Sequence, residues 1–309
     1  MSRILAVGSL AYDTVETPFG ARKDLLAGTA TYFSLAASHF APVSVVGAVG
    51  EDFRPEDLGL LASRGVDISA VERLPGRTFR WAAKYSDDMN DRVTLGTELG
   101  VFAEFNPVIQ ASHRRAPFIF LGNIDPDLQR QVCESVEKPR LVACDTMNFW
   151  IEGRREALER TLRLVDLLMI NDSEARLLAG ETNILAASRK IRLMGPKGLV
   201  VKRGEYGAAI FGEGFTSVLP AIFLEDVVDP TGAGDSFAGG LVGCLAALEA
   251  TDERALLLAA AAGTVMASFT VQGFGVEGLL RATPAAIADR CAALGRLVGG
   301  RPIELPLRS

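Results

Sequence analysis

A seven-residue segment, Asp-Pro-Thr-Gly-Ala-Gly-Asp at residues 229–235, combines two carboxylates with two closely spaced glycines. It runs into a small, apolar stretch at residues 236–240 that is typical of a packed helix. Glycines let the backbone approach a ligand closely, and the free N–H groups at the start of a helix favour phosphate. Asp235 would repel a phosphate but could accept a proton beside one. The segment therefore predicts phosphoryl transfer to a hydroxyl.

The composition is that of an ordinary globular protein with a large core. The chain has 309 residues, of which 49% are hydrophobic and 23% charged, which fits one large α/β domain or one with an inserted subdomain. The net charge of -6 argues against a nucleic-acid-binding surface. We therefore expect a small-molecule partner, with neither nucleic acid nor membrane.

Cysteines and histidines give no sign of a zinc site. The cysteines lack C-x-x-C spacing and the chain has two histidines, His39 and His113, so neighbouring residues cannot form a zinc cluster. The first apolar run, residues 4–7, is too short for a signal-peptide core, and we expect a cytoplasmic protein with reduced cysteines. Residues 255–271 carry no charge but include Gly263 and Thr264, which favours a buried helix over a membrane span.

Short apolar runs alternate with helical patterns along most of the chain. Buried strands are predicted at residues 4–7, 43–49, 118–121, 141–144, 167–170 and 199–201. Helices are predicted between them at residues 30–39, 127–136, 154–163, 174–179 and 184–193. This alternation predicts an α/β fold with a doubly wound, mostly parallel sheet flanked by helices. Helices at residues 233–249 and 253–270 and a last one starting at Thr283 complete the domain.

One interval departs from this alternation. Residues 78–86 and 92–97 have the pattern of two strands joined by the acidic turn 87–91. Such a hairpin cannot easily join a parallel sheet, so we expect a small β-hairpin lid inserted at about residues 76–103, possibly with residues 12–20 alongside. Flap hairpins can pair across subunits, which makes a homodimer through the lid a further expectation.

The segment 229–235 resembles the second signature of the ribokinase-like, phosphofructokinase-B type carbohydrate kinases, although Pro230 stands where the family commonly has Thr. The resemblance covers essentially the whole chain. It implies an ATP-dependent kinase that phosphorylates a hydroxyl of a sugar, sugar derivative or nucleoside, with Mg²⁺ as a cofactor and K⁺ as a candidate second cation. Asp235 would be the general base, and the amides of Gly232, Ala233, Gly234 and Asp235 would form an anion hole.

The resemblance also implies acceptor-binding residues, with departures from the family pattern. Asp13, after the first strand, would grip the acceptor, helped by Gly28, Tyr32, Asn123 and Asp145; each has a purely structural alternative as a turn, cap or packing residue. Asp125 and Asn148 are weaker candidates at the same edge of the sheet. Ala11, Ala27 and Tyr32 replace the family's Asn, Gly and Asn, which favours a nucleoside or another nonstandard acceptor.

Other segments are expected to hold the nucleotide and metal. Asn171 and Glu174 resemble the family's Asn-x-x-Glu element, which organises Mg²⁺ and phosphate, often through water, although the same residues can form a helix capping box. The nucleotide pocket would use Lys202, Gly204, Gly207 and Thr231, with adenine contacts within residues 262–275. Asp229 could help to bind a monovalent cation. Gly47, Gly50 and Asp52 match a family turn for which a structural role is favoured.

Three other classes of protein are alternatives. A noncatalytic nucleotide- or sugar-sensing protein could keep the fold without turnover, but the intact Gly-Ala-Gly-Asp sequence argues against it. No Gly-x-Gly-x-x-Gly follows the first strand and no Gly-x4-Gly-Lys-Ser/Thr string is present, which disfavours a dinucleotide oxidoreductase and a P-loop enzyme.

Overall fold

A computed structural model describes residues 2–89, 91–300 and 302–308. Over these residues a nine-stranded sheet has the order β13-β12-β11-β10-β9-β8-β1-β4-β5. Neighbours from β11 to β5 run parallel, whereas β12 and β13 are antiparallel. The strands are β1 (Ile4–Val7), β4 (Val43–Val49), β5 (Val66–Arg73), β8 (Phe118–Leu121), β9 (Leu141–Cys144), β10 (Leu167–Asn171), β11 (Gly198–Lys202), β12 (Ala208–Phe211) and β13 (Thr216–Leu219).

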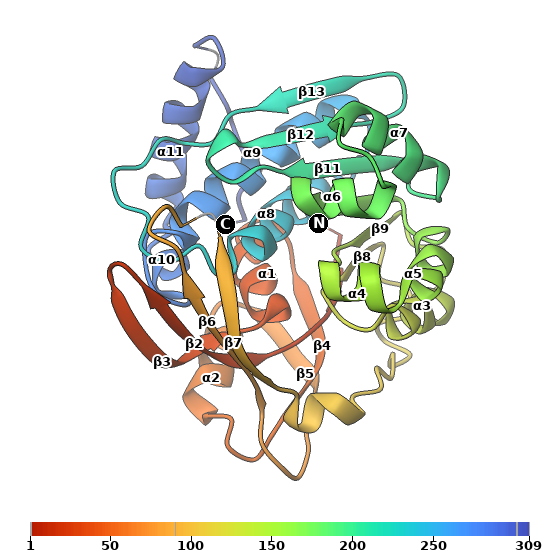
Figure 1. The fold of residues 1–309 in the computed structure, drawn as a ribbon, viewed down its shortest axis with the longest axis vertical. Helices are drawn as coiled ribbons and strands as arrows, with labels where there is room; N and C mark the ends of the chain where they lie inside the picture. The colour runs from red at the N-terminus through yellow and green to blue at the C-terminus, as the bar shows by residue number, and fades with distance from the viewer. Residues whose placement is uncertain (1, 90, 301, 309) are drawn as a thin grey trace.

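Helices cover both faces of this sheet (Figure 1). Ile4 and Ala6 on β1 belong to a hydrophobic cluster that includes residues of α1, α8 and α9, while Leu5 and Val7 belong to a second cluster with residues of α3, α5, α6 and α7. Successive strand residues point to opposite faces, so burial on both faces explains the continuous apolar runs. The helices are α1 (Thr29–Ala37), α2 (Pro55–Ser63), α3 (Pro126–Ser135), α4 (Asn148–Gly153), α5 (Arg155–Leu162), α6 (Asp172–Ala179), α7 (Ile184–Leu193), α8 (Ala233–Leu248), α9 (Glu253–Thr270), α10 (Glu277–Leu280) and α11 (Pro284–Leu297).

The predicted fold class is confirmed, and the predicted strands are all present. The predicted helix at 154–163 is present as α5, and α4 is an additional short helix that ends just before it, with Arg154 between the two. β5, β12 and β13 were not predicted, although β12 is a buried apolar run, Ala-Ala-Ile-Phe, of the kind that indicates a strand. β13 is Thr-Ser-Val-Leu at the edge of the sheet and half exposed, so it lacks the apolar run that marks a buried strand.

A second sheet of four strands, β3-β2-β6-β7, packs beside the first. The predicted hairpin is present as β6 (Phe79–Tyr85) and β7 (Arg92–Glu98), which pair antiparallel; Asn90, in its turn, lies outside the described residues. β2 (Ala11–Thr17) pairs parallel with β6 and antiparallel with β3 (Gly20–Ala27). Short 3₁₀ helices follow β7 (η1, Gly100–Glu104) and β11 (η2, Gly204–Tyr206).

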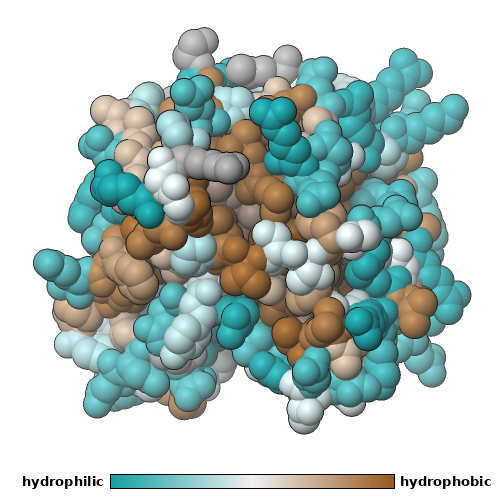
Figure 2. All heavy atoms as spheres, turned by 90° about the horizontal axis from the view of Figure 1, so that it is seen from above, coloured by the Kyte–Doolittle hydropathy of each residue, from teal (hydrophilic) through white to brown (hydrophobic). Residues whose placement is uncertain are grey.

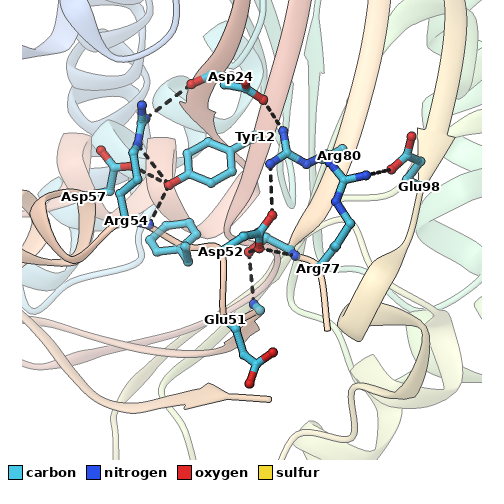
Figure 3. A network of polar contacts seen from close by, with 12 residues as sticks. Tyr12, Asp24, Glu51, Asp52, Arg54, Asp57, Arg77, Arg80 and Glu98 are labelled. Carbon is cyan, nitrogen blue, oxygen red and sulfur yellow. Dashed lines mark hydrogen bonds and ion pairs between the residues drawn. The ribbon is translucent and has the colours of Figure 1, made fainter. Parts of the chain in front are cut away.

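A polar network on one side of the second sheet ties it to the rest of the domain (Figure 3). The hydroxyl of Tyr12 donates to Asp57 at 2.6 Å, and Arg54 donates to Asp57 at 2.7 Å. Arg80 on β6 pairs with Asp24 and, at 2.9 Å, with Asp52. Burial, together with the hydrogen bond to Asp57, raises the pKa of Tyr12 to about 12. The network therefore holds β2 through the neutral hydroxyl group of Tyr12 and holds β6 through the ion pairs of Arg80.

Helix α8 packs closely on α1 and α9 through small residues. A Cβ added to Gly239 would lie 2.3 Å from the carbonyl oxygen of Phe33 on α1, and one added to Gly240 would lie 2.7 Å from the carbonyl oxygen of Ala262 on α9. α9 contains the uncharged segment considered above as a membrane span and is largely buried in the core. None of the helices within the described residues combines the length and apolarity that crossing a membrane requires.

Most of the surface seen in Figure 2 is hydrophilic, with apolar side chains gathered toward the middle of that face.

Candidate active site

A cavity of about 1870 Å³ lies where the carboxyl ends of the parallel strands meet the second sheet. This edge is where open α/β sheets bind ligands. All of the predicted site residues except Asp229 contribute to its wall. They are Asp13, Gly28, Tyr32, Asn123, Asp145, Asn171, Glu174, Lys202, Gly204, Gly207, Thr231, Gly232, Ala233, Gly234 and Asp235. The fold thus brings together residues from nearly the whole length of the chain.

The loop before α8 is held in place by Asp229, which is fully buried. Its two carboxylate oxygens accept hydrogen bonds from the amides of Thr231, at 2.9 Å, and Gly275, at 3.3 Å. Burial raises the pKa of Asp229, and these hydrogen bonds oppose the rise. Because both oxygens are used within the chain, the contacts support a structural role for this carboxylate.

The loop ends at Gly232, whose φ of 76° is left-handed, and α8 begins at Ala233. The amide of Ala233 donates to the carbonyl of Pro230 at 3.2 Å. Within the described part of the chain, the amides of Gly232, Gly234 and Asp235 have no hydrogen-bond partner. These N–H groups, together with the helix dipole, form a suitable cradle for an anion.

Asp235 lies in the first turn of α8, and the pKa of its carboxyl group is raised to about 7. The main cause is burial, and the negative charge of Asp145 adds to it; the positive charges of Lys202 and Arg92 act in the opposite direction. A carboxylate with a pKa near neutrality is well suited to exchange a proton at physiological pH.

Lys202, the last residue of β11, places a cation beside Gly234 in the anion cradle. Its Nζ donates to Asp145 Oδ2 at 2.9 Å, and a Cβ added to Gly234 would lie 3.0 Å from that nitrogen. Burial opposes its charge, but the carboxylates of Asp145, Glu174 and Asp235 outweigh this effect and raise the pKa of Lys202. A positive charge therefore lies beside the free amides, and Gly234 leaves room for it.

The Asn171–Glu174 element is a capping box at the start of α6. Asn171 Oδ1 accepts from the Glu174 amide at 2.8 Å, and Glu174 Oε2 accepts from the Asn171 amide at 2.9 Å. Burial and the nearby Asp145 raise the pKa of Glu174, against the effect of Lys202. Both residues also line the cavity, so the structural and ligand-binding roles are compatible. No group of three or more potential metal ligands occurs among the described residues.

Asp13 and Tyr32 contribute to the wall of the same cavity. Asp13 is 6% exposed, and the pKa of its carboxyl group is raised well above its usual value by burial and by the charges of Asp229 and Asp235. The ring of Tyr32 packs against Gly232, because a Cβ added there would lie 2.5 Å from ring carbons. The Tyr32 hydroxyl is buried, and no partner for it occurs among the described residues. Gly28 has a φ of 101° and packs closely on the backbone of Ser9.

The remaining residues predicted at this edge make mainly local contacts. Asn123 accepts a hydrogen bond from Trp150 Nε1 at 2.8 Å, and Asp125 caps α3 and pairs with Arg154 at 3.0 Å. Asn148 is the first residue of α4 and, like Asn123 and Asp125, lines the cavity. Asp125 therefore has the contacts of an ordinary cap.

The second sheet supplies cavity residues that sequence reasoning missed. Phe79, Trp81 and Tyr85 on β6, with Arg92 on β7, all line the cavity. Trp81 pairs in register with Asp13 on β2, and paired residues of neighbouring strands share a face. Aromatic residues occupy positions 79, 81 and 85 of β6. This spacing has the period of two of a strand and indicates in the sequence that one face of β6 is apolar.

The expected adenine region is partly in the wall. Within residues 262–275, Thr264, Ala267, Ser268 and Val271 line the cavity, and the segment 221–224 adds Ile222 and Phe223. Gly204 and Gly207 have positive φ values of 55° and 84° in the turn between β11 and β12. These glycines thus serve a hairpin and the cavity wall at once.

The Gly47–Asp52 turn has a structural role, the alternative favoured above. Asp52 Oδ1 accepts from the amide and the hydroxyl of Thr78, each at 2.7 Å. Burial opposes ionisation, but these hydrogen bonds and Arg80 lower the pKa of Asp52 to about 2. A Cβ added to Gly50 would lie 2.4 Å from the amide nitrogen of Thr78. The turn therefore fixes the base of the second sheet.

A family model described as pfkB family carbohydrate kinase matches residues 27–278. The chain belongs to this family. It is therefore a phosphotransferase with an alcohol group as acceptor, and the predicted resemblance is confirmed.

Similar proteins and a similar solved structure agree with this assignment. A cytidine kinase of Thermococcus kodakarensis is 30% identical over 251 residues, covering 78% of this chain and 88% of the relative. An ATP-dependent ribose-1-phosphate kinase of Halopiger xanaduensis is 32% identical over 266 residues, covering 81% and 79%. The nucleoside kinase of Burkholderia thailandensis in complex with inosine has the same fold, with a TM-score of 0.76 at 22% identity over 97% of this chain and 100% of that one.

Proposed function

We propose that this pfkB family kinase transfers the γ-phosphoryl group of ATP to a hydroxyl of a sugar, sugar derivative or nucleoside, with Asp235 as general base. The observation that carries the proposal is the start of α8, where Asp235 follows Gly232 and Gly234, whose amides have no partner among the described residues, in one cavity with Asp13. Asp235 would take the proton from the acceptor hydroxyl, and the amides would stabilise the charge on the transferred group.

The donor set fits a magnesium nucleotide. ATP supplies the phosphoryl group, and Mg²⁺ neutralises part of its charge. Mg²⁺ is commonly held by one or two carboxylates together with phosphates and waters, so the lack of a three-carboxylate cluster among the described residues is compatible with Glu174 acting through water beside Asn171. Lys202 and the amide of Gly234 would bind phosphate oxygens, and the turn at Gly204 and Gly207 would border the nucleotide.

On the acceptor side we propose that Asp13 holds the acceptor hydroxyls and that a nucleoside, or another acceptor with a bulky apolar group, is preferred. Trp81 shares a face of the second sheet with Asp13, and Phe79 stacks on Phe102 at 5.7 Å. Aromatic faces stack favourably on planar bases. The relatives named cytidine kinase and nucleoside kinase support the same preference. Tyr32 and Asn123 would border the acceptor, with Asp145 positioned through Lys202.

The test is a screen for ADP release with ATP and Mg²⁺ across ribose, fructose, hexonates, inositols and nucleosides, followed by mass analysis of the products. We expect one acceptor class to give turnover and Asp235→Asn to lose about 10²- to 10⁴-fold in kcat while still binding nucleotide. Efficient use of ribose or fructose over all others would remove the nucleoside preference. Ligand binding with no ADP release from any acceptor would favour the noncatalytic sensor.

A monovalent cation at Asp229 is a separate proposal. The carboxylate is fully buried near Thr231 and the amide of Gly275, so a cation would have to bind beside oxygens that already accept hydrogen bonds. Turnover measured in K⁺ and then in Na⁺ salts at equal ionic strength tests it. Equal rates in the two salts would remove K⁺ from the mechanism.

A homodimer through the second sheet is the last proposal drawn from the sequence. β7 is the edge strand of that sheet and is exposed along its length, with Val93 at 65% and Leu95 at 60%. Exposed edge strands are places where another chain can pair. Light scattering of the purified protein tests it, and a monomer at all concentrations would exclude it.

A further inference from the structure

The hairpin β6–β7 contacts the loop before α8 through two buried hydroxyl groups. The hydroxyl of Tyr85, the last residue of β6, lies 3.0 Å from Oγ1 of Thr231. Tyr85 is 7% exposed and Thr231 is 9% exposed, and both line the cavity. The contact joins residues 146 positions apart in the sequence, so it exists only when the hairpin lies over the cavity.

The opposite end of the hairpin is held by polar and charged contacts. Thr78 donates twice to Asp52, and Arg80 donates to the same carboxylate at 2.9 Å. Gly76 and Gly100, on either side of the hairpin, have positive φ values of 122° and 54°. Tyr85 is the seventh residue after Thr78 along extended chain, so the two lie about 23 Å apart at the usual rise per residue. The hairpin is therefore anchored by charged contacts at its base (Figure 3). Its far end, where the exposed Lys84 pairs with Glu16 on β2, reaches the loop.

On the loop side, the hydroxyl contact lies next to the anion cradle. The amide of Thr231 donates to the buried Asp229 at 2.9 Å, which fixes the backbone on one side of the contact. The following residue is Gly232, whose amide is one of the three unpaired donors within the described residues. Its left-handed φ of 76° is supported by the ring of Tyr32. A displacement of Thr231 would therefore shift the first amide of the cradle.

We propose that Tyr85 is a positioning residue for phosphoryl transfer: its hydrogen bond to Thr231 makes the arrangement of the anion cradle depend on the hairpin being closed over the acceptor. The inference rests on the proposed function of the cradle and adds a coupling that this function does not require. A contact between two neutral hydroxyls is weaker than the charged contacts at the base. It can therefore break and re-form in each catalytic cycle while the base stays fixed, as the gating of many active sites requires.

Three variants isolate this hydrogen bond. Tyr85→Phe removes one hydroxyl, Thr231→Val removes the other at nearly constant volume, and the double variant removes both. We expect each single variant to lower kcat by roughly 3- to 10-fold, the factor that corresponds to one net hydrogen bond, with the KM for ATP little changed. We also expect more ADP per phosphorylated acceptor, because an open hairpin admits water.

The double variant decides between coupling and independent effects. If the two hydroxyls act through one bond, the double variant has nearly the kcat of either single variant. Effects on kcat that multiply would overturn the inference, as would single variants with unchanged kcat. Thr231→Ser keeps a hydroxyl and is expected to lose less kcat than Thr231→Val; an equal loss would count against the bond.

Hydrogen exchange provides a readout that needs no turnover. In the protein without substrate, amides at the far end of β6, near residues 83–85, are expected to exchange about 3- to 10-fold faster in Tyr85→Phe and in Thr231→Val. Amides of β2 near the base are expected to stay unchanged. Unchanged exchange at the far end would overturn the inference, whereas a wild-type protein without phosphotransfer to any acceptor would instead count against the proposed function.

Discussion

The ionisation of Asp235 should govern the pH dependence of turnover. Burial and the charge of Asp145 raise the pKa of this carboxyl group to about 7, although Lys202 and Arg92 oppose the rise. A general base works only when it is ionised, so kcat/KM is expected to fall as the pH is lowered through about 7. With that pKa, about a tenth of the protein is ionised at pH 6 and about nine tenths at pH 8, which gives a roughly tenfold difference in kcat/KM.

The assay is kcat/KM for the acceptor at saturating ATP and Mg²⁺, from about pH 5 to about pH 9. Arg92→Gln removes a positive charge that lowers the pKa of Asp235, so the acid limb is expected to move to higher pH. Arg77→Gln is the matched control, because Arg77 lies at the base of the same hairpin and pairs with Glu98 at 3.3 Å. The residual activity of Asp235→Asn should lack the acid limb altogether.

Stability provides a second readout of the same carboxyl group. Since the folded state raises the pKa of Asp235, the stability that its protonated form contributes at low pH is lost as the pH rises through about 7. Asp235→Asn cannot ionise and is therefore expected to have a higher Tm than the wild type at pH 8, with a smaller difference at pH 6. A flat wild-type pH profile, or a lower Tm of Asp235→Asn at pH 8, would refute this account of the site.

Two further predictions concern residues around Asp235, the proposed general base. Gly232→Ala would place a Cβ 2.5 Å from the ring of Tyr32 at a φ of 76°, so we expect a lower Tm and at least about a tenfold loss of kcat; a variant with wild-type kcat and Tm would show that the loop relaxes freely. Glu174→Gln keeps an acceptor for the amide of Asn171 but loses the charge, so the Mg²⁺ concentration for half-maximal activity is expected to rise about 10-fold or more with little change in Tm. An unchanged Mg²⁺ requirement would place the metal elsewhere.

Much of the fold was predictable because parallel strands buried on both faces produce unmistakable apolar runs. β1, β8 and β9 are four-residue segments of this kind and are fully buried. The hairpin β6–β7 was predictable from its acidic turn. The edge strands β13 and β5 were not predictable in this way, because exposed residues interrupt them and they therefore lack a continuous apolar run.

The candidate site likewise combines features that the sequence predicted with features that only the tertiary structure shows. The segment 229–235 by itself predicted phosphoryl transfer to a hydroxyl, because two glycines, a helix start and a carboxylate are local features of the chain. The tertiary structure decided what surrounds that segment: Lys202 from β11 beside Gly234, the ring of Tyr32 against Gly232, and Tyr85 from the hairpin on Thr231. Local sequence could not show these contacts, because each depends on how distant strands and helices pack. The burial that brings the pKa of Asp235 to about 7 likewise arises only in the folded chain.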